Sequence, residues 1–166
     1  RDCNSLASTP ELPATTLTEN CYLEMFYGCS SLTVAPELPA TTLAPSCYNR
    51  MFHGCNSLIS APKLPAMTLS ENCYGGMFAE CSNLTSAPEL AAKILVGSCY
   101  SMMFEGCTKL NNITMLATDI SDSYCLFYWL DRVSSTGTFI KAKEMTSLPK
   151  GASGIPSGWS VKDYEE

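Results

Sequence analysis

Apolar residues recur along this chain at intervals of 26 residues, each in the same place among polar neighbours. Five columns of this kind stand out, one of methionine, one of phenylalanine and three of leucine. Their members are Met25, Met51, Met77 and Met103; Phe26, Phe52, Phe78 and Phe104; and the leucines that begin at Leu6, Leu12 and Leu17. A position that stays apolar in every repeat must point into a shared core, because only there is its burial repeated at each layer. The period therefore predicts a solenoid of stacked coils.

Each repeat divides into two halves with different patterns. The stretch Cys-Tyr-x-x-Met-Phe-x-Gly-Cys, first seen at residues 21–29, has apolar residues at i, i+1, i+4 and i+5, which predicts a single helical or 3₁₀ turn. The next stretch, residues 32–35, is short and β-prone, and Pro36 ends it. We therefore predict an α/β-type solenoid: a right-handed leucine-rich-repeat coil stack with short parallel strands and short helical turns. Strands of successive coils should lie about 4.8 Å apart.

The repeat decays toward the C-terminus, which predicts two regions. Residues 1–125 should form a solenoid of about five coils, and residues 126–166 should form a cap over its last layer. Within the cap, residues 137–141 and 158–161 alternate between apolar and polar positions, as two short strands would. We therefore predict a small β-rich C-terminal cap.

The repeat motif resembles that of a known family. Residues 25–32 read Met-Phe-Tyr-Gly-Cys-Ser-Ser-Leu, and this is similar to the Ala-Phe-x-Gly-Cys-x-x-Leu repeat of BspA-like leucine-rich-repeat surface proteins, which recurs at about 23 residues. The repeat here is three residues longer and carries a Pro-x-Leu-Pro-Ala insert. The resemblance covers about residues 3–125, and the Gly-rich tail is similar to tails of surface proteins from the same anaerobic gut and oral bacteria. It implies surface display and adhesion or recognition, not catalysis.

Composition and charge exclude several classes of function. The net charge is −6 and only 16% of residues are charged, so the clustered basic surface that nucleic acid requires is not expected. No apolar run approaches the roughly eighteen residues of a membrane span. We expect a monomer that is secreted or held at the cell surface, with a signal peptide or lipid anchor encoded upstream of Arg1.

The ten cysteines form two columns of the same period, starting at Cys3 and Cys21. Disulfides between residues 18 apart would use all ten, whereas thiols in the core would match the heavy burial of unpaired cysteine. If residues 21–29 were helical, the two columns would be roughly 12 Å apart, beyond the roughly 7 Å limit for a bridge. Core thiols are therefore favoured, and disulfides remain the alternative. A metal site is not expected, because there is no Cys-x-x-Cys spacing and only one histidine.

Candidate chemistry is sparse. His53 lies two residues before Cys55, so a nucleophile and base could be imagined, but no other cysteine of that column has a histidine nearby. No phosphate-binding loop or distinctive pair of carboxylates is present, so we expect neither an enzyme nor a cofactor. Binding residues should instead lie in columns that vary between coils. Tyr27, Arg50 and His53 belong to two such columns and are the candidate binding patch.

These observations lead to a predicted function and one alternative. The prediction is a non-catalytic bacterial cell-surface protein whose repeats bind a host or neighbouring-cell protein or glycan. The alternative is a structural spacer or assembly element of a larger surface protein or of a phage-tail-like assembly.

Overall fold

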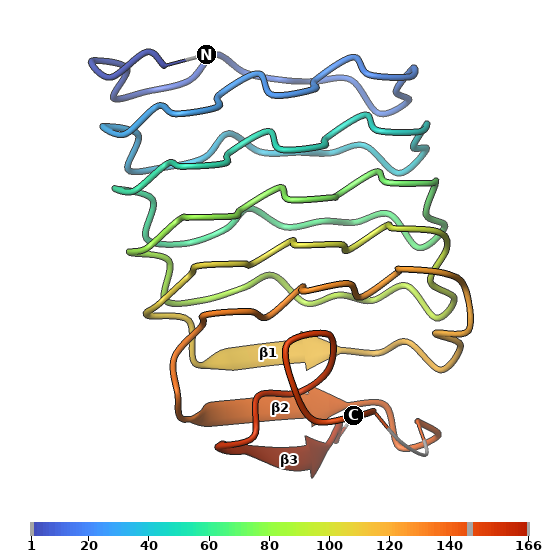
Figure 1. Cartoon of the computed structure of the whole chain (residues 1–166). Helices are drawn as coiled ribbons and strands as arrows, with labels where there is room; N and C mark the ends of the chain where they lie inside the picture. The colour runs from blue at the N-terminus through green and yellow to red at the C-terminus, as the bar shows by residue number, and fades with distance from the viewer. Residues whose placement is uncertain (1, 146–147, 166) are drawn as a thin grey trace.

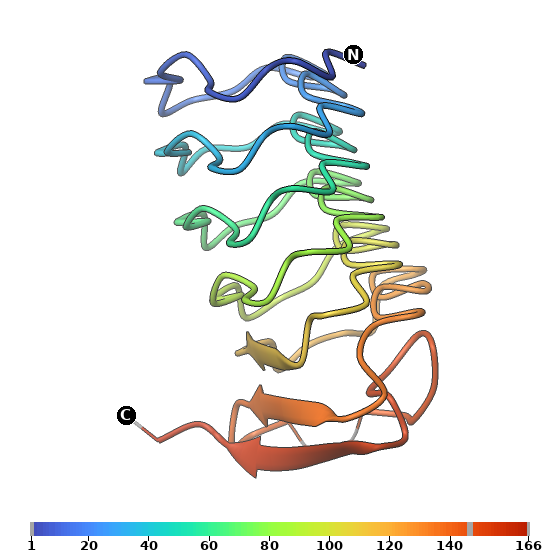
Figure 2. The same cartoon turned by 90° about the vertical axis from the view of Figure 1, so that its left-hand side faces the viewer.

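The computed structural model describes residues 2–145 and 148–165. The chain winds through successive coils stacked one above another, from the N-terminal coil at one end to a small sheet at the other (Figure 1). A second view shows tight, closely wound turns along one side of the stack and wider loops along the opposite side (Figure 2). The tail passes beneath the last coil and forms the end of the stack.

The predicted α/β class, with short helical turns and a short strand in each coil, is wrong. No helix occurs among the described residues, which contain three strands: β1 (Asn112–Met115), β2 (Gly137–Lys141) and β3 (Trp159–Asp163). The three pair in parallel in the order β1-β2-β3. Most of the chain is therefore held by turns and by hydrogen bonds between coils.

The stretch predicted to be helical is a series of overlapping β-turns. We call residues 21–29 and their equivalents 47–55, 73–81, 99–107 and 125–133 the turn ladder. In the first four of these stretches, odd-numbered N–H groups bond three residues back, as Met25 does to the Tyr22 carbonyl, while even-numbered ones bond to the next coil, as Phe26 does to the Met51 carbonyl. An α-helix would send every N–H four residues back. In the turn ladder the backbone conformation repeats every four residues, as the positive φ of Glu24 and Gly28 shows. This repeat, like the 3.6-residue turn of an α-helix, places residues i, i+1, i+4 and i+5 on one face.

Proline explains why the predicted strands in the coils do not form. Each of the first four repeats places a proline in one column (Pro10, Pro36, Pro62 and Pro88), and most add a second proline three residues later. Proline has no N–H to donate to a neighbouring strand. Contacts between these segments are accordingly reduced to isolated bridges such as Ser60–Ser86. The first strand, β1, forms where the column changes to Thr114.

The first strand of the tail keeps the spacing of the repeat, and the second departs from it. β2 pairs with β1 at an offset of 26 residues, as Ile113 does with Phe139, whereas β3 pairs with β2 at an offset of 22, as Phe139 does with Val161. The segments predicted as cap strands, 137–141 and 158–161, lie in β2 and β3, apart from Gly158. Trp129 occupies the methionine column of the last coil, is fully buried, and donates its Nε1–H to the Gly154 carbonyl at 2.9 Å.

The core consists of the repeated columns packed in register. Phe52, Phe78 and Phe104 are fully buried, and their rings stack at centroid distances of 5.6 and 5.7 Å. Such parallel offset stacking adds to the burial of apolar area. The rows of identical side chains therefore both fill the interior and align the coils.

All ten cysteines are thiols in the structure, and eight of them are buried, as the favoured alternative predicts for core residues. In the column that begins at Cys3, three thiols have partners: Cys55, Cys81 and Cys107 each donate to the carbonyl of a phenylalanine in the preceding coil at 3.1 Å. Burial raises the pKa of Cys55 to about 12 and that of Cys81 well above its ordinary value. These thiols therefore stay protonated at neutral pH.

This burial predicts a strong contrast in alkylation. At pH 7.5 iodoacetamide should modify exposed Cys21 at least ~100-fold faster than Cys81, because only an accessible thiolate reacts. Peptide mapping by mass spectrometry measures both rates. Denaturation without reductant serves as the control and should yield ten modified residues. Rapid native modification of Cys81, or fewer than ten labels after denaturation, would contradict the structure.

Candidate functional site

The residues that vary between coils lie along the outward side of the turn ladder. One row, which we call the outer row, consists of Glu24, Arg50, Gly76, Met102 and Tyr128. All five have positive φ, from 52° to 59°. A non-glycine residue held in this conformation costs on the order of 1 kcal/mol, but the N–H of Arg50 bonds to the Gly75 carbonyl at 2.8 Å and keeps it there. The ladder thus presents different side chains on one repeated backbone.

The structure brings the three predicted patch residues together. The rings of Tyr27 and His53 stack with their centroids 4.6 Å apart and their planes inclined by 11°. Arg50 is in the same turn as His53, whose N–H bonds to the Arg50 carbonyl. The Arg50 guanidinium lies 3.8 Å from a carboxylate oxygen of Glu24 and is half exposed. The patch therefore combines an aromatic stack with an accessible cation.

The electrostatics of the patch keep His53 neutral. Burial lowers the pKa of His53, and the Arg50 cation lowers it further. Its Nδ1 atom is buried and has no hydrogen-bond partner among the described residues. A neutral imidazole can stack on Tyr27 without loss of a charge's hydration, so Arg50 is the cation that this part of the ladder presents at neutral pH.

His53 and Cys55, the candidate base and nucleophile, are not arranged for nucleophilic catalysis. The Cys55 side chain is fully buried and donates to the Phe26 carbonyl, and its pKa is raised to about 12. A reactive cysteine requires an accessible thiolate with a lowered pKa. Cys55 is a core residue with the same bond as Cys81 and Cys107.

Toward the C-terminal end of the ladder, the charged side chains form ion pairs with one another. The Arg132 guanidinium bonds to Glu80 and, at 3.0 Å, to Glu105, while Asp131 lies 3.6 Å away. These hydrogen bonds raise the pKa of Arg132. Because the guanidinium already has carboxylate partners from two other coils, Arg132 is better suited to holding the ladder together than to binding a ligand.

A small hollow, which we call the notch, opens in the third coil where Gly75 and Gly76 replace the larger residues of the other coils. Its volume is about 210 Å³. Asn49 and Arg50 bound it on one side and Ser101 and Met102 on the other.

The notch is a built feature and not a gap in packing. Asn49 Nδ2 donates to Asn72 Oδ1 at 3.1 Å and to the Gly75 carbonyl at 2.9 Å, and Asn72 Nδ2 donates to Ser46 Oγ at 3.2 Å. A side chain at position 75 would overlap the two amide groups. Gly75 is therefore required for the paired asparagines, and the pair shapes one wall of the notch.

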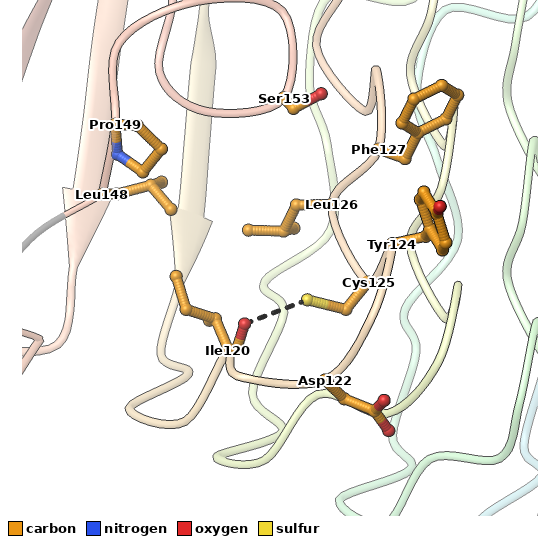
Figure 3. A pocket seen from close by; sticks show the side chains of 9 residues that line it. All are labelled: Ile120, Asp122, Tyr124, Cys125, Leu126, Phe127, Leu148, Pro149 and Ser153. Carbon is orange, nitrogen blue, oxygen red and sulfur yellow. Dashed lines mark hydrogen bonds between the residues drawn. The ribbon is translucent and has the colours of Figure 1, made fainter.

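A second hollow, of about 300 Å³, lies between the last coil and the tail loop (Figure 3). Leu126 lies near its middle, Leu148 and Pro149 lie at one side, Tyr124 and Phe127 lie together at the opposite side, and Asp122 lies at the lower edge of the view. Cys125 donates to the Ile120 carbonyl at 3.4 Å. Its walls are chiefly apolar and join the tail to the stack, so we assign it to the capping of the solenoid.

Sequence reasoning had named neither hollow. The signal for the notch was present, because Gly75 and Gly76 stand where the other coils carry Leu-Glu, Asn-Arg, Ser-Met and Phe-Tyr. Interpreting it required knowledge that these two rows face outward. The end hollow depends on the path of the tail loop, for which the repeat provides no template.

Comparison with known proteins adds no assignment: no protein-family model, curated protein or solved structure matches this chain. Across residues 2–145 and 148–165, no helix is long and apolar enough to cross a membrane. Within the same residues, no group of three or more His, Cys, Asp or Glu side chains could hold a metal ion. Any assignment of function therefore depends on the ladder itself.

Proposed function

We propose that this protein is a non-catalytic binding module, displayed outside a bacterial cell, whose turn ladder recognises a protein or glycan of a host or neighbouring cell. The observation that carries the proposal is the stack of Tyr27 and His53 next to the exposed guanidinium of Arg50. Tyrosine and arginine are enriched among the residues that dominate binding energy. An aromatic ring in a rigid stack also loses little conformational entropy when a partner binds.

The backbone of the ladder supports this proposal. In the first four coils even-numbered N–H groups bond to the next coil, so the patch residues are held in place before any partner arrives. A preorganised surface of this kind binds without the entropy loss of ordering a loop. The BspA-like resemblance of the repeat motif points to the same class of function.

The test is a screen of the folded chain against purified extracellular-matrix proteins and an array of host glycans. We expect at least one partner whose affinity falls at least ~10-fold in the double variant Tyr27→Ser/His53→Ala. The matched control is Val34→Ala/Ile59→Ala, two exposed positions outside the ladder. A partner that binds both variants equally well would remove the patch from the proposal. A screen without any partner would favour the spacer function.

A further inference from the structure

We propose that the notch in the third coil binds the carboxylate-bearing ring of an acidic sugar, such as a terminal uronic acid, with Arg50 as the group that recognises the charge. This inference deepens the proposed function, because it names a ligand class for the same ladder. It depends on four features of the notch: its size, the hydrogen-bonding capacity that remains on its polar side chains, its apolar wall and its charge.

The size of the notch suits one ring-sized group. Pockets for drug-sized molecules occupy about 300–1,000 Å³, and the notch at about 210 Å³ is smaller than these. It is lined by Arg50 from the second coil and by Met102 from the fourth. A single ring at the end of a chain can enter such a space, and a folded domain or a helix cannot.

The polar atoms around the notch offer both donors and acceptors. Asn49 uses both amide hydrogens within the protein, which leaves its Oδ1 atom as an acceptor, and Asn72 uses one of its two. Ser101 Oγ donates to the Phe127 carbonyl at 3.4 Å and can still accept. A sugar hydroxyl both donates and accepts, so neighbouring hydroxyls of one ring match this mixed set.

Charge and shape add selectivity. The Arg50 guanidinium makes no hydrogen bond to another described residue, since Glu24 lies 3.8 Å away, and it remains half exposed. Its planar donors match a carboxylate in a two-bond geometry. The Met102 side chain provides an apolar wall for the C–H face of a ring. An acidic sugar engages the cation, the polar atoms and the apolar wall together, whereas a neutral sugar leaves the cation with only its 3.8 Å ion pair to Glu24.

The outer row provides a variant that fills the notch without disturbing the backbone. Gly76→Met places at position 76 the residue that coil four carries at Met102, where φ is 53°, close to the 59° of Gly76. The new Cβ would lie 3.1 Å from Arg50 Cγ, so the flexible Arg50 side chain must shift slightly. Arg50→Gln removes the charge alone. Lys63→Gln makes the same change of charge at an exposed position outside the ladder and is the matched control.

The experiment is an NMR titration of backbone amides with three probes: methyl β-D-glucuronide, methyl β-D-glucoside, and acetyl-glutamate amide, which carries a carboxylate without a sugar ring. We expect the glucuronide to bind with a Kd on the order of 1 mM, as suits so small a ligand, and to shift the amides of Gly75 and Gly76. The glucoside and acetyl-glutamate amide should bind at least ~10-fold more weakly. Gly76→Met and Arg50→Gln should each weaken glucuronide binding at least ~10-fold, and Lys63→Gln should leave it unchanged.

Several results would overturn the inference. These are no binding of the glucuronide, equal binding of the two sugars, binding of acetyl-glutamate amide as tight as that of the glucuronide, or affinities that neither variant changes. Failure here is distinct from failure of the proposed function. A partner found in the screen that depends on Tyr27 and His53 but is insensitive to Gly76→Met would retain the binding module and remove the acidic-sugar site.

Discussion

Replacing Trp129 by alanine is expected to lower the free energy of unfolding by about 3–5 kcal/mol, the range for large-to-small changes in a core. The side chain is fully buried, meets Phe139 of β2 edge-to-face with ring centroids 6.1 Å apart, and bonds to the Gly154 carbonyl. Its loss would leave a cavity between the last coil and the tail and an unpaired carbonyl. For a protein of this length Tm should fall by about 6–20 °C, as thermal unfolding followed by circular dichroism would show.

Two further variants separate the causes of this loss. Trp129→Phe keeps much of the apolar volume but removes the Nε1–H donor, and it should lower stability by about 1–3 kcal/mol. Met67→Ala, at a side chain that is 57% exposed, is the control and should change stability by no more than about 0.5 kcal/mol. If Trp129→Ala unfolds at the temperature of the unmodified protein, the tail does not contribute to the stability of the stack.

Replacing Phe78 by alanine is expected to lower the free energy of unfolding by about 3–5 kcal/mol as well. Phe78 is fully buried in the middle of the stack, with Phe52 on one side and Phe104 on the other. The variant loses both ring contacts in addition to buried area. Each coil contacts mainly its neighbours, so a weakened middle coil should also make unfolding less cooperative. Urea unfolding would show this as a lower midpoint and a smaller dependence on denaturant.

The comparison for Phe78 again uses matched variants. Phe78→Leu retains an apolar side chain and should lower stability by less than the alanine variant, by about 1.5 kcal/mol or less. Val34→Ala, at a side chain that is 67% exposed, should change it by no more than about 0.5 kcal/mol. Equal effects of the leucine and alanine variants would mean that ring stacking, and not buried area, stabilises this column.

Part of the candidate site follows from the period of the sequence. Tyr27 and His53 are 26 residues apart, and positions at that separation lie one above another throughout the stack, as the phenylalanine rings do. Arg50 is near them because it precedes His53 by three residues in a tight turn. The paired amides of Asn49 and Asn72 are not visible in the same way, because their separation of 23 residues belongs to no column.

The local conformation of the coils could not be predicted from the apolar pattern. A period of four residues and a helical period of 3.6 are indistinguishable over one or two turns, so the pattern at 21–29 fitted both. The difference lies in the partners of the even-numbered N–H groups, which are in another coil. Proline in the opposite half of the repeat limits pairing there to isolated bridges until Thr114 replaces it.

The amino-acid sequence by itself determined which side chains lie above one another, because burial in a shared core requires the same apolar residue at the same place in each coil. It also determined which rows are able to vary. Only the tertiary structure decided how the backbone between those positions is satisfied, that Cys55, Cys81 and Cys107 donate to carbonyls, and that two glycines open a notch beside Arg50. These features depend on hydrogen bonds and contacts between coils, which no single repeat contains.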